Sequence, residues 1–457
     1  MSARQPVIIL PSETRSREFD AKLLLAALLA AKGAAVYVGA RSAIHAALHR
    51  LPPSTYIAKD FRRASRRVFN ILKDLGHSIV GWDEEGILNF NLQSYIERRV
   101  DAPTLARLDE IFAWGDENAA MTVASPGYHG QPLHVTGNPR IDMLRAELRP
   151  FHDPEVATLR QRFGGFILVN TNFGTLNHHL RQYVVDPRAE KASGGVTLTP
   201  EVRQSWEHRF KLYDAFRALL PELARALPNQ TIVLRPHPSE NLENWRQLLS
   251  GFANVHVLHE GAVAPWLMAC RVLVHSNCTT AIEGFLAGTK VISFRPHVSD
   301  QHDHELANVV SCPTYSQAEL VACLRAGAMP APAAAAEVQW QAVAKNFASL
   351  TGALASDQIA AHMLASHDAR LARAATRLAA RARGQLHSRL RALHRQWVAG
   401  QESHKNSRSY EEKRFPSLAS AEVDEKLERF RRLFPTMPPL AATASGKNIF
   451  RVERRPV

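Results

Sequence analysis

The sequence predicts an α/β protein with two parallel-stranded domains and a helical extension behind them. Short apolar segments alternate with helix-like segments, first within residues 1–147 and again within residues 148–328. This alternation requires crossover helices, so the strands of each domain are expected to be parallel. Polar clusters follow several of the apolar segments, at the strand ends where open α/β sheets bind their ligands. Residues 329–457 are rich in arginine and predict mainly helices.

The first domain is expected to begin at the apolar segment 7–10 and to add its strands in chain order. Further strands are expected at 35–38, 55–58, 77–82, 110–114 and 132–136, with helices at 21–32, 42–49, 62–75 and near 118–123. Pro150, Pro154 and paired glycines then mark a connector. We expect a Rossmann-like domain before this connector.

The second domain repeats the pattern. Strands are expected at 166–170, 231–234, 255–258, 272–275 and 291–294, with helices at 200–227, 242–250, 264–269 and 280–287. Two Rossmann-like domains that face each other across a cleft form the GT-B-like architecture of glycosyltransferases and of some epimerases and kinases. Because one fold serves many activities, the function has to be argued from the residues.

The composition is that of an ordinary globular protein. The chain has 457 residues, 46% of them hydrophobic and 22% charged. It contains no run near the roughly 18 apolar residues that cross a bilayer, and residues 1–6 lack a signal-peptide pattern. Its four cysteines have no CxxC spacing, which argues against a zinc cage or a disulfide framework. These features predict a cytoplasmic protein.

The net charge of +13 is concentrated in the last part of the chain. Residues 361–457 hold 20 Lys and Arg against 9 Asp and Glu. Arg370 to Arg395 contains eight arginines and no acid, and apolar residues recur there every three or four positions, which predicts one amphipathic helix. This helix either docks on an anionic surface or packs on the protein itself. The anionic surface is a membrane, which would place the protein on the inner face of the inner membrane, or an acidic polymer. No nucleic-acid partner is expected, because no nucleic-acid module is visible.

Polar residues at three strand ends of the second domain suit a phosphate-bearing ligand. Hydroxyl, amide, imidazole and guanidinium groups and helix-start N–H groups all bind anions. An alternative for 170–172 is an Asn-rich turn, and Glu283, a candidate partner for ribose hydroxyls, can equally be a surface residue. The candidate nucleotide- and phosphate-binding residues are Arg235, His237, Ser276, Asn277, Thr279, Thr280, Glu283, Asn170, Thr171 and Asn172.

Acidic residues end two strands of the first domain. Asp83, Glu84 and Glu85 follow one strand, and Glu13 follows another. Adjacent carboxylates repel each other, which raises the pKa of at least one and makes it a candidate proton acceptor for a hydroxyl. The alternative is that these acids cap helices or pair with nearby cations such as Arg17 and Lys22.

His302, Asp303 and His304 are spaced as metal ligands on an extended loop can be. However, no third element supplies a further ligand that the sequence can name, and 21 histidines make such groupings common. We therefore predict that the protein uses no metal and no cofactor.

Several of these segments, taken in order, resemble the bacterial surface carbohydrate biosynthesis protein family. The His-Pro step at 237–238 and the Ser/Thr cluster after it also resemble, more distantly, bacterial Kdo transferases and sialyltransferases. That resemblance implies that His237 contacts a nucleotide phosphate, that Ser276, Thr279 and Thr280 surround it, and that the donor is CMP-linked. The segments are Pro11–Thr14, Arg17–Lys22, Asp83–Gly86, Phe112–Gly115, Thr136–Arg140, Asn170–Phe173, Arg235–Pro238, His275–Thr280 and Lys413–Pro416.

The sequence thus predicts a glycosyltransferase that moves a sugar from a nucleotide-activated donor, such as CMP-Kdo, onto a bacterial surface polysaccharide or its lipid-linked precursor. An acid of the first domain would act as a general base in an inverting enzyme or as a nucleophile in a retaining one. Three alternatives share the expected fold: a CDP-glycerol-type glycerophosphotransferase, a sugar-nucleotide 2-epimerase, and a non-catalytic scaffold of envelope glycan assembly.

Overall fold

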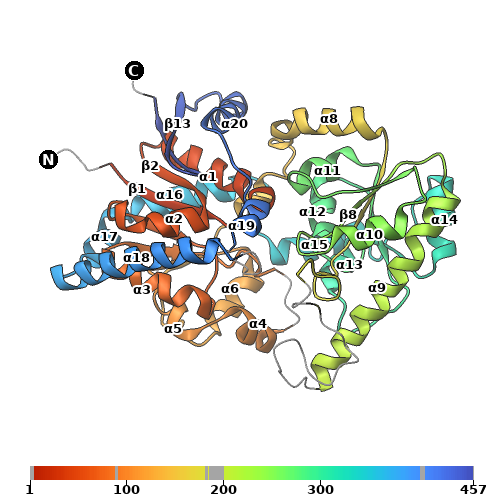
Figure 1. Ribbon diagram of the computed structural model, residues 1–457, viewed down its shortest axis with the longest axis horizontal. Coiled ribbons are helices and arrows are strands. Elements are labelled where there is room, and N and C mark those ends of the chain that lie inside the picture. Colours follow the sequence, from red (N-terminus) through yellow and green to blue (C-terminus); the bar gives the residue numbers. More distant parts are fainter. Residues whose placement is uncertain (1–4, 88–90, 181–183, 185–199, 402–406, 456–457) are drawn as a thin grey trace. The chain divides into compact units, whose positions relative to one another are not determined.

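The computed structural model describes residues 5–87, 91–180, 184, 200–401 and 407–455 (Figure 1). The chain divides into two compact units. The first combines Met1–Phe151 with Ala344–Val457, and the second is His152–Val343. Each unit is built on a mainly or wholly parallel sheet with helices. The predicted class, α/β with the two Rossmann-like units of a GT-B-like protein and a helical region near the C-terminus, is confirmed.

The sheet of the first unit has eight strands in the order β13-β14-β2-β1-β3-β4-β5-β6. The six strands from β2 to β6 in this order are parallel, and β14 joins β2 in the antiparallel direction. The strand order reverses between β1 and β3, which is the switch point where doubly wound sheets bind ligands. The strands are β1 (Val7–Ser12), β2 (Ala35–Ala40), β3 (Thr55–Ala58), β4 (Ser78–Gly81), β5 (Glu110–Ala113), β6 (Leu133–Val135), β13 (Leu440–Gly446) and β14 (Ile449–Arg454).

The two faces of this sheet bury separate hydrophobic cores because side chains alternate along each strand. Ile8 and Leu10 point into the core that contains helix α1, whereas Ile9 points into the core of helix α3. The helices before the connector are η1 (Arg15–Phe19), α1 (Asp20–Ala31), α2 (Arg41–Ala47), η2 (Leu48–Arg50), η3 (Arg63–Ser65), α3 (Arg66–Leu75), α4 (Leu92–Arg99), α5 (Ala102–Leu105), α6 (Asp116–Val123), α7 (Pro139–Asp142) and η4 (Arg149–His152).

The C-terminal part of the chain differs from the extension expected at 329–457. From Ala344 onward it belongs to the first unit, and its last two strands extend that unit's sheet. The single helix expected over 370–395 is also wrong, because the helix breaks at Ala375, which has extended backbone angles. The helices are α15 (Ala336–Asn346), α16 (Ala355–Ala365), α17 (His367–Ala374), α18 (Leu378–Ala399), α19 (Arg408–Arg414) and α20 (Ser420–Leu433).

The second unit has six strands in the order β12-β11-β10-β7-β8-β9, all parallel. Counted along the chain within this unit, this is the Rossmann order 3-2-1-4-5-6, with its switch point between β7 and β10. Its elements are α8 (Asp153–Phe163), β7 (Ile167–Asn170), α9 (Pro200–Ala226), β8 (Ile232–Arg235), α10 (Leu242–Leu249), β9 (Val255–Val257), α11 (Val263–Ala269), β10 (Val272–His275), α12 (Thr280–Ala287), β11 (Val291–Phe294), α13 (Glu305–Val309), β12 (Cys312–Thr314) and α14 (Gln317–Ala326).

No described helix is long and apolar enough to cross a membrane.

Candidate functional site

The strand ends of the first unit hold a cluster of alternating charges. Glu13 follows β1 and Lys59 follows the neighbouring strand β3, so these two residues flank the switch point. Asp83, Glu84 and Glu85 follow β4, the next strand in the sheet. The structure therefore brings all four predicted catalytic acids to one edge of one sheet.

Two lysines lie between these acids: Lys22, which the sequence offered as a possible partner, and Lys59, which it did not. Lys59 pairs with Glu13 and with Glu18, the latter at 3.3 Å. Lys22, one helical turn after Glu18, pairs with Glu18 at 2.8 Å and approaches Glu84 at 3.5 Å. Lys59 could have been recognised as a strand-end residue, and the Glu18–Lys22 spacing is that of an i, i+4 helical pair.

The cations reverse the pKa shift expected for Glu13. Burial raises its pKa, but the charges of Lys59, Arg41 and Arg414 outweigh burial and hold the pKa well below the ordinary value. Glu18 behaves alike, since Lys22 and Lys59 overcome its burial. The expected repulsion between neighbouring carboxylates is therefore not the dominant effect at Glu13.

Asp83 and Glu84 are buried and held by protein groups. Arg99 grips the Asp83 carboxylate with two nitrogens, Nε at 2.9 Å from Oδ2, and burial raises the pKa of Asp83. Trp82 donates its indole N–H to Glu84 Oε2 at 2.7 Å. Both side chains thus stabilise the loop after β4.

Glu85 is the accessible acid of the group. Its side chain is 42% exposed and pairs with Arg99 at 2.9 Å and Arg17 at 3.2 Å. Burial raises its pKa, but Arg17 and Arg99 outweigh burial, so the pKa is lowered and the group is ionised at neutral pH. The pairing with Arg17 matches the alternative that the sequence left open.

A segment from the far end of the chain completes this edge. Arg414, the last residue of α19, pairs with Glu13, and the Phe415 ring packs edge-on against Phe19 at 5.6 Å. The Lys413–Pro416 segment noted in the sequence is therefore part of the first unit's strand-end cluster.

In the second unit, two predicted binding residues, Asn170 and Arg235, lie on adjacent strands in register with His275, which precedes the predicted residue Ser276. Asn170 on β7 pairs with Arg235 on β8 and with His275 on β10. With strands about 4.8 Å apart, the loops after β8 and β10 emerge about 10 Å from each other, with the β7 loop between them. The loops after β10, β7 and β8 therefore leave the sheet at the same strand ends, and their convergence on one phosphate pocket stays a prediction.

Glu240, which the sequence interpretation missed, ties two of these loops together. Its buried carboxylate accepts hydrogen bonds from the Phe173 N–H at 3.0 Å and the His237 N–H at 3.1 Å. Thr171 Oγ1 donates to it at 2.8 Å and Trp245 Nε1 at 2.9 Å. Thr171 is therefore a loop-stabilising residue. Glu240 was missed because its link to the β7 loop, through Thr171 and Phe173, joins segments that are distant in the sequence.

The exposed His237 ring is fixed in one orientation. Ser239 donates its N–H to His237 Nδ1 at 3.2 Å, and Ser239 Oγ lies 2.8 Å from the same atom. Because Nδ1 accepts, the neutral ring carries its proton on Nε2 and presents an N–H donor there. A Cβ at Gly174 would clash with Ser239 Oγ, so a larger residue there would displace the hydroxyl that contacts His237.

Two buried polar atoms at this edge have no hydrogen-bond partner within the described part of the chain. They are Asn170 Oδ1 and Arg235 Nε, on side chains that are 3% and 8% exposed. Burial lowers the pKa of Arg235 to about 10, while the charge of Glu283 opposes this shift. Glu283 is itself buried, so it balances the charge of Arg235.

The Ser276–Thr280 loop leads into the N-terminus of α12. Thr279 is the N-cap residue, and Thr280 Oγ1 lies 2.6 Å from Cys278 Sγ. Ser276 is buried at the end of β10. The first N–H groups of α12 are thus presented at the strand ends next to the β7 loop.

Asn277 has a structural role. Its φ of 52° is left-handed, and its amide donates to the His302 carbonyl at 3.1 Å and accepts from the His304 N–H at 2.5 Å. Asp303 in turn pairs with Arg295 and His208. The His302–His304 segment therefore braces the loop. Asn172 offers its carbonyl to Arg209 at 2.8 Å.

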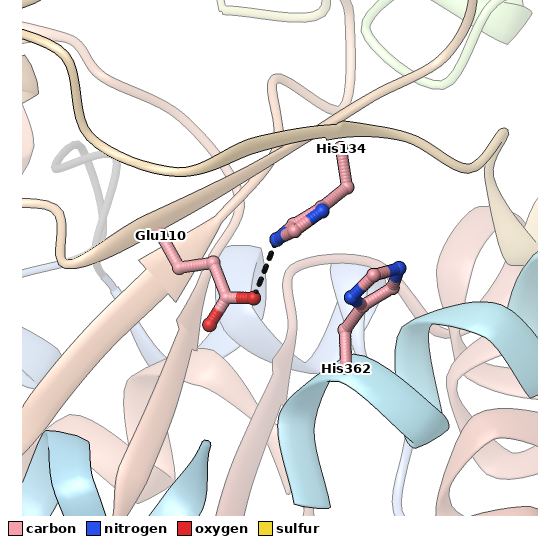
Figure 2. A group of neighbouring side chains, drawn as sticks. All are labelled: Glu110, His134 and His362. Atoms are coloured by element: carbon pink, nitrogen blue, oxygen red, sulfur yellow. Dashed lines mark ion pairs between the residues drawn. The ribbon is translucent and has the colours of Figure 1, made fainter. Parts of the chain in front are cut away.

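Glu110, His134 and His362 form a group of possible metal ligands whose ligating atoms lie within 4.8 Å of one another (Figure 2). Glu110 contacts His134 Nε2 at 2.8 Å through Oε1 and pairs with Arg370 through Oε2. The two histidine rings stack at 3.8 Å, so their in-plane lone pairs run side by side instead of converging. This arrangement suits an ion-paired network, and we assign no metal to it.

No protein-family model and no curated protein matches the chain, so the family resemblance stays a prediction. Solved structures with similar folds include a wall teichoic acid polymerase TagF with CDPG, at a TM-score of 0.49 and 11% identity over 80% of this chain and 89% of that one. The UDP-GlcNAc 2-epimerase from Neisseria meningitidis bound to UDP-GlcNAc gives 0.49 and 13% over 79% and 100%. That of Methanocaldococcus jannaschii, with UDP-GlcNAc and UDP, gives 0.47 and 10% over 79% and 99%. At these values the comparisons assign no activity to this chain.

Proposed function

We propose that the protein is a glycosyltransferase that takes a sugar from a nucleotide-activated donor. The observation that carries the proposal is the strand-end edge of the second unit. There Asn170, on a strand that borders the Rossmann switch point, lies beside Arg235 on the next strand, and both bury polar atoms that no described protein group satisfies. Buried polar atoms need partners, and a ligand at this edge would supply them.

The chemistry of the edge suits a phosphate. His237 presents an imidazole N–H, Arg235 a guanidinium and α12 its N-terminal backbone N–H groups. Such donors stabilise the negative charge that builds on a departing nucleotide phosphate without a metal ion. In this proposal the phosphate is held by His237 with Ser276, Thr279 and Thr280, and Asn170 takes a hydroxyl or amino donor of the ligand.

Glu85 is our choice for the acid that acts on the acceptor. Of the four predicted catalytic acids, Asp83 and Glu84 are buried by protein partners, and Glu13 is engaged by three cations. Glu85 is ionised and accessible, as a general base or nucleophile must be. The donor we propose is a CMP-linked 2-keto sugar acid such as Kdo, and the acceptor a bacterial surface polysaccharide or its lipid-linked precursor.

A nucleotide-binding titration tests the first half of this proposal. Calorimetry with CMP, CDP, UDP and GDP, alone and as sugar conjugates, should detect binding of one base to the wild-type protein. His237→Ala should weaken that binding by at least about 10-fold, because a hydrogen bond to a charged phosphate is lost. His256→Ala changes an exposed histidine on β9 of the same unit and should bind normally. Unchanged affinity in His237→Ala would refute the assignment.

Turnover assays separate the alternatives. A glycosyltransferase consumes the nucleotide sugar only when an envelope glycan acceptor is added. An epimerase turns over a UDP-sugar without acceptor, a glycerophosphotransferase consumes CDP-glycerol, and a scaffold binds without turnover.

A further inference from the structure

Helix α18 is attached to the first unit by a face made of small and polar residues. Gly384 and Ser388 are buried, one helical turn apart, and Val398 is buried near the end of the helix. A Cβ at Gly384 would lie only 2.9 Å from the Asp74 Cβ on α3, so the two helices touch closely at this point. Gln385 also donates to the His49 carbonyl at 3.2 Å. These contacts fix which side of α18 faces the protein.

The opposite side of α18 carries the large apolar residues. Leu386, Leu390, Leu393 and Trp397 follow each other at steps of four, three and four, so they share one helical face. They are 56%, 53%, 61% and 67% exposed. Within the described residues, every leucine or tryptophan that is more than half exposed lies on α18. The alternative that this stripe packs on the protein body is therefore wrong.

Positive charge lies beside this apolar face. Arg389, which precedes Leu390, is exposed and makes no ion pair with any described residue, and Arg383 on the other flank pairs with Asp74. Arg377 and Arg381 are also exposed, but they precede Gly384 by seven and three residues and therefore lie on the side of α18 that faces the protein. Nearby elements add to the same field, because Arg50 and Arg389 both act on His49, and Arg67 of α3 acts on Arg391. A large apolar stripe with positive charge beside it marks an interaction surface.

We propose that the outward face of α18 docks on an anionic lipid surface. Leu386, Leu390, Leu393 and Trp397 would enter the boundary between headgroups and acyl chains, while the arginines face lipid phosphates. A helix with leucine and tryptophan on one face, arginines beside them and no acid from Arg370 to Arg395 has the character of an in-plane interfacial helix. This inference does not depend on the proposed reaction.

Vesicle flotation with the full chain tests the proposal. Vesicles of phosphatidylcholine and phosphatidylglycerol in a ratio of about 2:1 should bind the protein at least about 10-fold more tightly than phosphatidylcholine alone, because each arginine near an anionic surface adds to the binding. Brominated acyl chains should quench Trp397 fluorescence, measured as the difference between the wild-type protein and Trp397→Phe.

Surface variants separate the apolar and electrostatic contributions without disturbing the docked face of α18. The triple variant Leu386→Ser, Leu390→Ser and Leu393→Ser should lose binding to both vesicle types by at least about 10-fold. The variant Arg389→Gln should weaken the preference for anionic vesicles. Val298→Ser and Arg432→Gln change an exposed valine and an exposed arginine elsewhere and should bind as the wild type does. Unchanged thermal unfolding verifies that each variant is folded.

Three results would overturn the proposal. The first is no binding to anionic vesicles, and the second is binding that the leucine variant retains. The third is a concentration-dependent dimer in sedimentation that the leucine variant converts to monomer while vesicles bind neither form, which would make this face a contact between two copies of the chain.

Discussion

The two sheets of this protein end in edges of opposite character. At the switch point of the first unit, Glu13, Glu18, Lys22 and Lys59 neutralise one another. At the strand ends of the second unit, Asn170 on β7 and Arg235 on β8 leave buried polar atoms without a partner among the described residues. The charged groups of the first edge pair with one another, whereas the second edge has buried polar atoms that lack a hydrogen-bond partner among the described residues. The difference indicates that the second edge is the one shaped for a tightly bound polar ligand.

The same comparison assigns different duties to the acids. In the first unit, cations hold Asp83 and Glu13 in place, and Glu85 alone of the predicted catalytic acids is more than a third exposed. In the second unit, Glu240 is fully buried and organises the loops from which His237 projects. An acid at a strand end can thus either act on a substrate, if its side chain is exposed, or hold backbone N–H groups in place, if its side chain is buried.

The largest expected effect is on turnover and concerns Glu85. Glu85→Gln removes the proposed base while keeping its size, so kcat should fall about 10²- to 10⁴-fold, with nucleotide affinity unchanged. Glu222→Gln, at an exposed glutamate of α9, is the matched control and should keep full activity. A Glu85→Gln protein with wild-type kcat would show that the first edge provides no base at this position.

The next largest effect is on stability and tests whether the first edge is self-neutralised. Lys59→Met leaves Glu13 and Glu18 without their shared cation, so the free energy of unfolding at pH 7 should fall by about 3–5 kcal/mol in urea titrations. Lys32→Met, at an exposed lysine, should change it by less than about 0.5 kcal/mol. Equal stability of the two variants would contradict the role given to Lys59.

The pH dependence of the free energy of unfolding tests the same cluster of charges. The pKa values of Glu13 and Glu18 are lowered in the folded state, so their contribution is complete above the ordinary Glu pKa of about 4.3. It is lost as the pH falls below that value toward the folded-state pKa. Wild-type stability should therefore decline below about pH 4.5, and Lys59→Met should decline less steeply. Parallel acid-unfolding curves would contradict this account.

Glu240→Ala tests whether the loops of the second unit form the nucleotide-binding site. Loss of the carboxylate leaves the Phe173 and His237 N–H groups unpaired, which should cost about 3 kcal/mol of unfolding free energy and weaken nucleotide binding. Glu243→Ala, three residues further and exposed, should have little effect on either. Normal nucleotide affinity in a folded Glu240→Ala protein would show that these loops do not form the binding site.

The smallest expected effect distinguishes a ligand-binding atom from a structural one. Asn170→Ala removes a buried acceptor that has no described protein donor, so nucleotide affinity should fall about 5-fold while unfolding free energy stays within about 1 kcal/mol of wild type. Calorimetry and urea unfolding measure the two quantities on the same sample. A large loss of stability with unchanged affinity would mean that Asn170 serves the fold.

Local sequence patterns were sufficient to predict most strands. They also predicted that the candidate residues lie at the carboxyl ends of those strands. The run Val272–Val274 and the turn after it predicted β10 and its loop, and parallel pairing then placed that loop beside Asn170. The hairpin β13–β14 was missed, although Gly446 and Asn448 separate two segments that fit a hairpin, with Ile449–Arg454 alternating in hydropathy. The helix-like composition around it favoured helices.

Ion pairs between segments that are distant in the sequence could not be predicted from local patterns. Arg414 pairs with Glu13, which lies 401 residues earlier in the sequence, and no local pattern near either residue predicts this pair. The sequence left open which side of α18 faces the protein for a different reason. Its leucine periodicity is equally compatible with burial and exposure, and the small residues Gly384 and Ser388 that decide the matter leave only a weak signal.

The most direct test of the central claim is hydrogen–deuterium exchange of the full chain with and without the nucleotide that binds in calorimetry. The account predicts that the nucleotide slows exchange at 170–174, 237–241 and 276–282, while the loops at 13–18 and 82–86 of the first unit change little. Protection confined to the first unit's loops, or absent from all three loops of the second, would contradict it.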